Sequence, residues 1–158
     1  GANGVRTGGT EATPVFRNNL FYMNWWGIEF CWGSRAIVEN NILSGNDAGL
    51  VICQGDPGEV KSYPICRFND VWGNDIDFMH DYHGNWRLVS AEQFGSDNVS
   101  FDPLFSEQDF YNADFDFGRP GLKDAGNPGL FDADGSRSDI GPNWDWSWVD
   151  SSLLIPLK

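Results

Sequence analysis

The sequence predicts an all-β solenoid of few coils, followed by a loop-rich closing segment. Two observations support this: an internal repeat, and short apolar runs that Asn, Asp, Gly and Ser interrupt every few residues. Long Leu/Ala/Glu/Lys runs, which favour helices, are absent. The chain has 158 residues, of which 41% are hydrophobic, so it is long enough to bury a core.

The repeat has a spacing of 22 residues. Phe16–Phe21 matches Val38–Leu43 at this offset, and Cys31 matches Cys53 at the same offset. A looser third copy, Arg67–Trp72, begins 29 residues after Val38, which predicts an inserted loop of about seven residues. Such repeats bury their apolar faces by stacking short strands about 4.8 Å apart.

Asparagines at equivalent repeat positions are expected to stack. Asn19, Asn41 and Asp70 are the candidates for a ladder of side chains that satisfies turn backbone groups. Around this ladder we expect an irregular segment at 1–13, the coils at 14–99, and a closing segment with a Trp-rich tail at 100–158. The first coil would then present an open edge, which a preceding part of the protein or a partner must cover.

The net charge limits the classes of molecule that the protein is expected to bind. The net charge of −13 disfavours nucleic acid and acidic membrane surfaces. No stretch is long and apolar enough to predict a membrane span. The acidity fits a soluble extracellular protein, and the alternative is binding of a divalent cation such as calcium, which prefers carboxylate and carbonyl oxygens.

The three cysteines are Cys31, Cys53 and Cys66. None forms a CxxC pair, so the spacing gives no support for a zinc site. All three are disulfide candidates: Cys31 with Cys53 on adjacent coils, or Cys53 with Cys66 across the inserted loop. Buried free thiols are the third possibility.

The densest group of chemically active side chains is at 75–83. If this segment is a strand with Ile76 and Phe78 in the core, the outer face carries the candidate catalytic residues Asp75, Asp77, Asp81 and His83. Alternate carboxylates on one face lie about 6.6–7 Å apart, within the range of inverting glycosidases. The alternative is a solvated polar face.

Two further motifs suggest binding. Asp132, Asp134, Ser136 and Asp139 are candidate calcium ligands around a Gly turn, although the spacing does not fit an EF-hand, and a structural turn is the alternative. Trp144, Trp146 and Trp148 would share one face of a strand and stack on sugar rings, or pack against protein. We expect Trp25, Trp26 and Trp32 in the core or at its rim.

The closing motifs resemble those of the secreted right-handed parallel β-helix proteins of the pectate-lyase-like superfamily. Ser100–Phe105 resembles the family's "DPLF" segment, Gly121–Pro128 its "SPAIDAG" segment, and Asp132–Gly141 its "DPDGSRADIG" segment. The resemblance covers roughly residues 14–143, and it departs from the family pattern near Lys123 and in the small number of coils. It implies a right-handed parallel β-helix outside the cell or at its surface.

The function that follows is an extracellular module that binds polysaccharide and, if it is an enzyme, processes it as a hydrolase or lyase. No lyase motif of the family is present, so the resemblance assigns no catalytic residue. The alternative is a structural subunit that associates with another protein chain through its open end, as a filament or in a larger complex. Calcium is the one cofactor under consideration.

Overall fold

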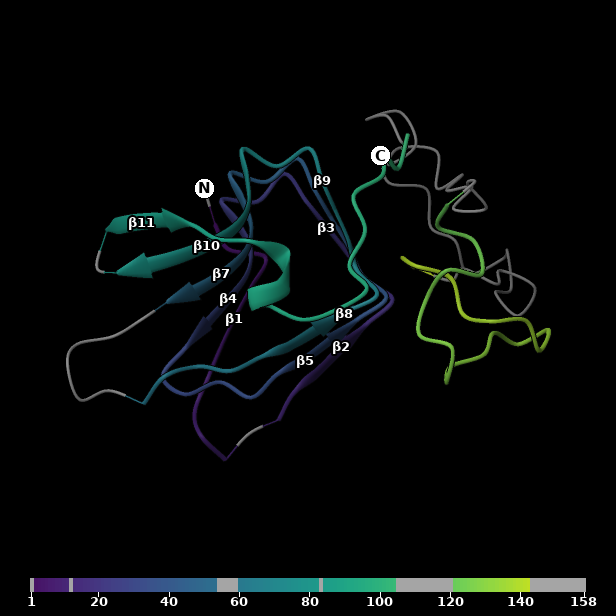
Figure 1. The fold of residues 1–158 in the computed structure, drawn as a ribbon, viewed down its shortest axis with the longest axis horizontal. Helices are drawn as coiled ribbons and strands as arrows, with labels where there is room; N and C mark the ends of the chain where they lie inside the picture. Colours follow the sequence, from purple (N-terminus) through teal and green to yellow (C-terminus); the bar gives the residue numbers. More distant parts are fainter. Residues whose placement is uncertain (1, 12, 54–59, 83, 105–120, 143–158) are drawn as a thin grey trace, which may run out of the picture.

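The computed structural model describes residues 2–11, 13–53, 60–82, 84–104 and 121–142 (Figure 1). Nearly all regular structure in these ranges is short strand. The strands are β1 (Val5–Gly8), β2 (Val15–Arg17), β3 (Leu20–Tyr22), β4 (Trp26–Cys31), β5 (Ile37–Glu39), β6 (Ile42–Ser44), β7 (Ala48–Cys53), β8 (Ile65–Arg67), β9 (Asp70–Trp72), β10 (Ile76–Tyr82) and β11 (Asn85–Leu88). One 3₁₀ turn, η1 (Ala91–Gln93), follows them.

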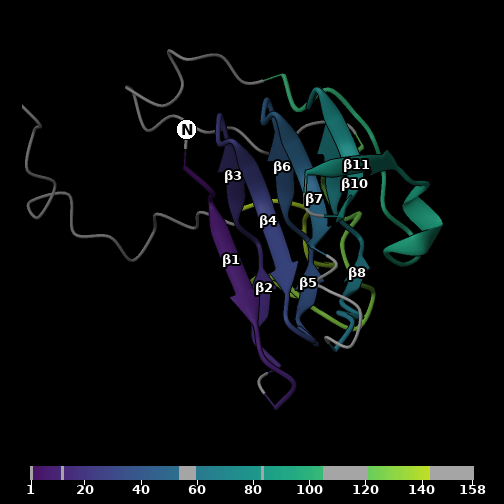
Figure 2. The ribbon, with the colours of Figure 1, turned by 90° about the vertical axis from the view of Figure 1, so that its left-hand side faces the viewer.

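The strands form three separate small sheets. The five-stranded sheet has the order β1-β4-β7-β10-β11, and the two three-stranded sheets have the orders β2-β5-β8 and β3-β6-β9. The chain therefore runs through the three sheets in the same order three times, which we call three passes. Figure 2 shows the strands of the five-stranded sheet side by side, in the order of the passes.

The register confirms the 22-residue spacing for the first two passes. Phe16 pairs with Val38 and Leu20 with Ile42, both in parallel. The third pass is different from the prediction, because Val38 pairs with Cys66 and not with Arg67. The spacing between ladder residues of the second and third passes is accordingly 28 residues, not 29.

Two asparagine ladders join the passes. In the first, Asn19 donates to Oδ1 of Asn41, Asn41 to Asn69 and Asn69 to Asn98. The predicted third member, Asp70, is wrong by one residue. A second ladder, which was not among the predictions, runs through Asn24, Asn46 and Asn74.

Each ladder residue follows a residue with a left-handed backbone. Asn18, Asn40 and Phe68 have φ values of 53°, 57° and 55° and precede the first ladder. Met23, Gly45 and Gly73 occupy the same position before the second ladder. The tight turn leaves a backbone N–H unpaired, and the asparagine Oδ1 of the next pass accepts it, as Asn41 does for the N–H of Asn19.

The predicted fold class, a right-handed parallel β-helix, is wrong. The described residues form an all-β structure with parallel pairing, but in three separate small sheets, and the largest of these is mixed because β11 pairs with β10 in the antiparallel direction. The chain reverses after β10, where Oδ1 of Asp81 accepts the N–H of Gly84 at 2.8 Å. The segment 1–13, expected to be irregular, contains β1, which pairs with β4.

The main core lies between the three sheets. Its buried members come from every sheet and include Phe30 and Leu50 of the five-stranded sheet, Val38 and Cys66 of the second, and Leu43 of the third. Alternate side chains of each strand face this interior. Phe94, just after η1, packs against Phe30 and covers one end of the core.

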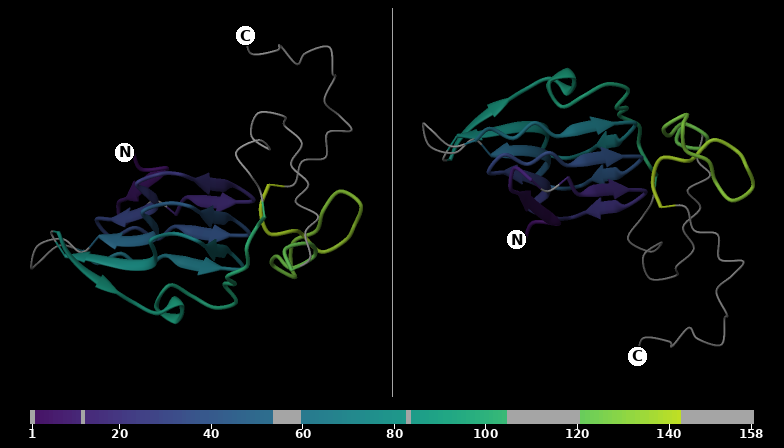
Figure 3. Two further views of the ribbon diagram at one scale, coloured as in Figure 1. Left: turned by 90° about the horizontal axis from the view of Figure 1, so that it is seen from above. Right: turned by 90° about the horizontal axis from the view of Figure 1, so that it is seen from below.

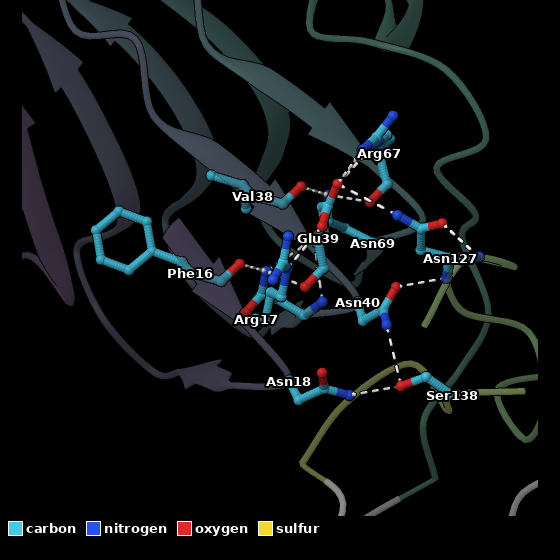
Figure 4. Close-up of polar contacts among 12 residues, drawn as sticks. Phe16, Arg17, Asn18, Val38, Glu39, Asn40, Arg67, Asn69, Asn127 and Ser138 are labelled. Atoms are coloured by element: carbon cyan, nitrogen blue, oxygen red, sulfur yellow. Dashed lines mark hydrogen bonds and ion pairs between the residues drawn. The ribbon is translucent and has the colours of Figure 1, made fainter. Parts of the chain in front are cut away.

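The segment 121–142 packs on the outer face of the third sheet and at the corner between the two small sheets (Figure 3). Leu122 and Ile140 bury Ile42 there. At the corner, Asn18 donates to the carbonyl oxygens of Asp139 and Gly141. Asn18 and Asn40 both donate to Oγ of Ser138 (Figure 4). The turn residues of the first ladder therefore also anchor the closing segment.

A buried carboxylate lies beside this corner. Glu39 of β5 is fully buried and forms ion pairs with Arg17 and Arg67, its register partners on β2 and β8 (Figure 4). Asn127 of the closing segment donates to the same carboxylate at 3.3 Å. Burial alone would raise the pKa of Glu39, but the hydrogen bonds from the two arginines lower it overall, so the charge is stabilised.

Candidate functional site

A hollow of about 180 Å³ lies on the face of the five-stranded sheet that points away from the main core. The residues that line it come from β4, β7 and β10, from the turn before each of these strands, and from β11. They are Trp25, Trp26, Asp47, Ala48, Asp75, Ile76, Met79 and Trp86.

The repeat itself builds one wall of the hollow. Trp25, Asp47 and Asp75 each follow a residue of the second asparagine ladder and occupy the same position in the three passes. Backbone hydrogen bonds hold this row together, because Ala48 donates to the carbonyl of Trp25 and Ile76 to that of Asp47. Both carboxylates are exposed at the rim.

The floor is apolar. Trp26, Ala48 and Ile76 are register partners on β4, β7 and β10, and they pack with Met79. The small Ala48 between two large neighbours makes the depression. The rings of Trp25 and Trp26 lie 5.6 Å apart at an angle of 44°.

Trp86 lines the hollow from β11. It pairs with Asp81 of β10, and its side chain is 58% exposed, while that of Trp25 is 47% exposed. Rings this exposed are unusual for structural tryptophans, which bury most of their surface. The hollow thus combines aromatic surfaces, an apolar floor and two carboxylate acceptors, a set of groups typical of small-ligand sites.

The predicted catalytic residues do not gather at one place. Asp75 lies at the rim of the hollow, whereas half-buried Asp77 accepts a hydrogen bond from Asn74 at 2.9 Å. Asp81 is buried and holds the turn at Gly84, and His83 lies outside the described residues. Of the two residues expected in the core, Phe78 packs there but Ile76 packs on the opposite face.

The candidate calcium ligands make the contacts of a turn. Oδ1 of Asp134 accepts the backbone N–H and the hydroxyl of Ser136, at 2.9 and 2.6 Å. Oδ1 of Asp139 accepts the N–H of Asp124 at 2.7 Å. For Asp132, the backbone N–H donates to the carbonyl of Ser136. Calcium binding at this loop stays a prediction.

The remaining candidates divide between described and undescribed parts. Trp144, Trp146 and Trp148 lie outside the described residues. The three cysteines are free thiols: Cys31 and Cys66 are buried and Cys53 is half-buried. Cys66 faces the main core, so it does not lie with Cys53 as the second predicted pairing requires.

Trp25 and Trp26 are expected from the sequence in the core or at its rim, and the hollow is not predicted. The repeat contained the signal, because the 22-residue offset aligns Trp25 with Asp47. Trp86 was not predictable in this way, since the chain reversal that forms β11 has no counterpart in the repeat.

The comparisons with known proteins add no relative. No protein-family model matches the chain, and no curated protein or solved structure matches it either. Among the described residues, no helix has the length and apolar character needed to cross a membrane. The candidate site is therefore interpreted from its own geometry.

Proposed function

We propose that this chain is an extracellular carbohydrate-binding protein and that the tryptophan hollow binds a sugar unit of a polysaccharide. The observation that supports this is the arrangement of Trp25, Trp26 and Trp86 around an apolar floor, with Asp47 and Asp75 at the rim. The C–H faces of a sugar ring pack on flat aromatic surfaces, and its hydroxyl groups donate to carboxylates.

The charge of the molecule favours a neutral polysaccharide. The net charge is −13, and the two polar side chains at the rim are both carboxylates. A uronic acid would be repelled unless a cation bridged it to the protein. Neutral hexose or pentose polymers carry no such penalty.

Binding is better supported than hydrolysis. Of the described residues predicted to be catalytic, only Asp75 lines the hollow, while Asp77 and Asp81 are engaged in hydrogen bonds within the protein. A hydrolase needs an acid and a second carboxylate on opposite sides of the scissile bond, whereas Asp47 and Asp75 lie in one row on the same wall of the hollow.

The test is binding of soluble neutral polysaccharides, measured by affinity electrophoresis and titration calorimetry. We expect Trp25→Ala and Trp86→Ala each to weaken binding about tenfold, because each removes one stacking surface. Asp75→Asn should weaken it less, since an amide oxygen can still accept a hydroxyl. Release of reducing ends from the same mixtures would reveal hydrolysis.

Trp32→Ala is the matched control, because Trp32 is 53% exposed but lies outside the hollow. Trp32→Ala should bind neutral polysaccharide as tightly as the unchanged protein. A calcium chelator should leave the binding of both proteins unchanged. If the hollow variants also bind normally, the proposed site is wrong. If an acidic glycan binds only with calcium present, the preference for neutral sugars is wrong.

A second candidate function is assembly with further copies of this chain. The observation that favours it is the position of β1, β2 and β3, which are the terminal strands of the three sheets and lie at the same end of the molecule (Figure 3). Terminal strands offer unpaired backbone groups to an incoming chain.

A further inference from the structure

Two thiols and a carboxylate meet on the five-stranded sheet, and none of the three residues lines the tryptophan hollow. Glu29 and Cys31 alternate with core residues along β4, and Cys53 ends the neighbouring β7 (Figure 2). One ligand atom from each of the three lies within 4.8 Å of the others. Sγ of Cys31 is 3.2 Å from Oε1 of Glu29, and Glu29 and Cys31 are both 1% exposed.

The carboxylate of this group is held in a fixed orientation. Arg6 on β1 donates to both oxygens of Glu29, with its Nη2 at 3.0 Å from Oε1. Asn3 donates to Oε2 at 2.6 Å. Such outer contacts orient a ligand and add one positive charge beside it.

The negative charges around the two thiols favour a bound cation. The Cys31 thiol is buried and the Cys53 thiol is half-buried, and both lie beside the Glu29 carboxylate. Asp81, the register partner of Cys53 on β10, adds a further negative charge. A divalent cation would be attracted by these negative groups, and it would stabilise the deprotonated thiolates directly.

We propose that Glu29, Cys31 and Cys53 bind one Zn²⁺ ion through two thiolates and one carboxylate oxygen. On binding, each thiol releases its proton to solvent, and two Zn–S bonds and one Zn–O bond form. The three ligands then carry three negative charges, which the ion and Arg6 together neutralise. Three protein ligands leave the fourth tetrahedral position to water, on the side of half-buried Cys53.

The carboxylate distinguishes this site from a simple disulfide pair. A Cys31–Cys53 disulfide would need no buried acid beside it, and it would leave the negative charge of Glu29 balanced by Arg6 alone. Thiolate ligands select zinc over the hard cation calcium. The sequence spacing gave no sign of this site, because the ligands come from two passes and lack a CxxC pair.

The experiment titrates the reduced protein with Co²⁺ as a spectroscopic probe and then with Zn²⁺. We expect one Co²⁺ per chain, a thiolate-to-cobalt charge-transfer band, the visible bands of tetrahedral cobalt, and loss of all of them when Zn²⁺ is added. Cys31→Ser and Cys53→Ser should each halve the charge-transfer intensity and weaken binding more than about 100-fold. Glu29→Gln should keep the intensity per bound ion and weaken binding.

Cys66→Ala is the matched control, because this buried thiol faces the main core. It should retain the complete spectrum. The proposal is overturned if the unchanged protein gives no charge-transfer band, or if the Cys31→Ser, Cys53→Ser double variant keeps it. Peptide mapping that finds a native Cys31–Cys53 disulfide would also overturn it. Circular dichroism of each variant distinguishes loss of the ligand from loss of the fold.

Discussion

Glu39 and Asp70 are both fully buried carboxylates, yet their neighbours act on them in opposite directions. Two arginines pair with Glu39 and lower its pKa overall. Within the described part of the chain, Asp70 has one backbone partner, the N–H of Phe101 at 2.8 Å, and its Oδ2 has no partner. Burial raises the pKa of Asp70 to about 7, and the carboxylates of Asp77 and Asp102 act in the same direction.

Asp70 should make the protein less stable as the pH rises. The folded state holds the Asp70 proton up to about pH 7, whereas the unfolded chain loses it near the ordinary value of 3.8. The contribution of this group to stability is therefore complete below pH 3.8 and is lost as the pH rises to about 7. We expect the free energy of unfolding to fall by up to about 4 kcal/mol over this range.

Urea denaturation of Asp70→Asn at pH 4 and pH 8 checks this expectation. The variant should lack this component of the pH dependence and be more stable than the unchanged protein at pH 8. Glu11→Gln, at an exposed acid, is the control and should follow the unchanged protein. Parallel pH curves for Asp70→Asn and the unchanged protein would contradict the assignment.

Among the elements, the first asparagine ladder shows how the position of a residue in the ladder determines its contribution to the stability of the fold. Asn41 lies inside the ladder: it donates to the carbonyl oxygens of Phe16 and Glu39 and accepts from Asn19. Asn19 lies at the exposed end and has fewer partners.

Asn41→Ala should therefore destabilise the fold by about 3 kcal/mol, because several buried backbone groups lose their partners. Asn19→Ala should cost about 1 kcal/mol. Denaturation midpoints of the two variants give the comparison. Equal losses would mean that the ladder acts through turn conformation alone and not through its buried hydrogen bonds.

The sequence predicted the ladder and its spacing where the copies are alike. Asn18-Asn19 and Asn40-Asn41 have the same sequence, so their alignment is unambiguous. In the third pass, Phe68 takes the left-handed position that asparagine holds in the first two passes. An alignment of the sequence alone places Asn69-Asp70 opposite the Asn pairs, which shifts the predicted ladder residue by one position.

The chain reversal after β10 could not be predicted from the sequence repeat. All four residues of β11, Asn85–Leu88, are exposed, so burial in the core does not determine the position of this strand. Its pairing depends on the turn at Asp81 and Gly84, a local contact without a repeated sequence signal. The antiparallel pair in the five-stranded sheet and the side of the hollow that Trp86 lines both depend on this one turn.

At the scale of the whole molecule, the two ends of the stack differ. At one end, β11 pairs with β10, Phe94 accepts the N–H of Cys66, and Val99 bonds with Asn69 and Val71. At the other end, β1, β2 and β3 are the terminal strands of their sheets among the described residues. Val15 on β2 is 48% exposed there.

If this end is an interface between copies, the mass measured by light scattering should rise with protein concentration. Val15→Lys should shift the equilibrium toward the monomer, because a charge on a terminal strand opposes pairing. Val60→Lys is the matched control, since Val60 is 53% exposed and lies outside the three terminal strands. A constant monomer mass for the unchanged protein would exclude assembly through these strands.

The ladders also give the molecule a chemical polarity. Every rung donates in the same direction, from Asn19 toward Asn98 and from Asn24 toward Asn74, so the side-chain dipoles add along the stack. Among the described residues no donor reaches Oδ1 of Asn19, so the β1–β2–β3 end offers acceptors. Only a surface rich in N–H donors can continue the ladder hydrogen bonds at this end. Two copies that meet through this same end cannot continue them, because each copy presents acceptors.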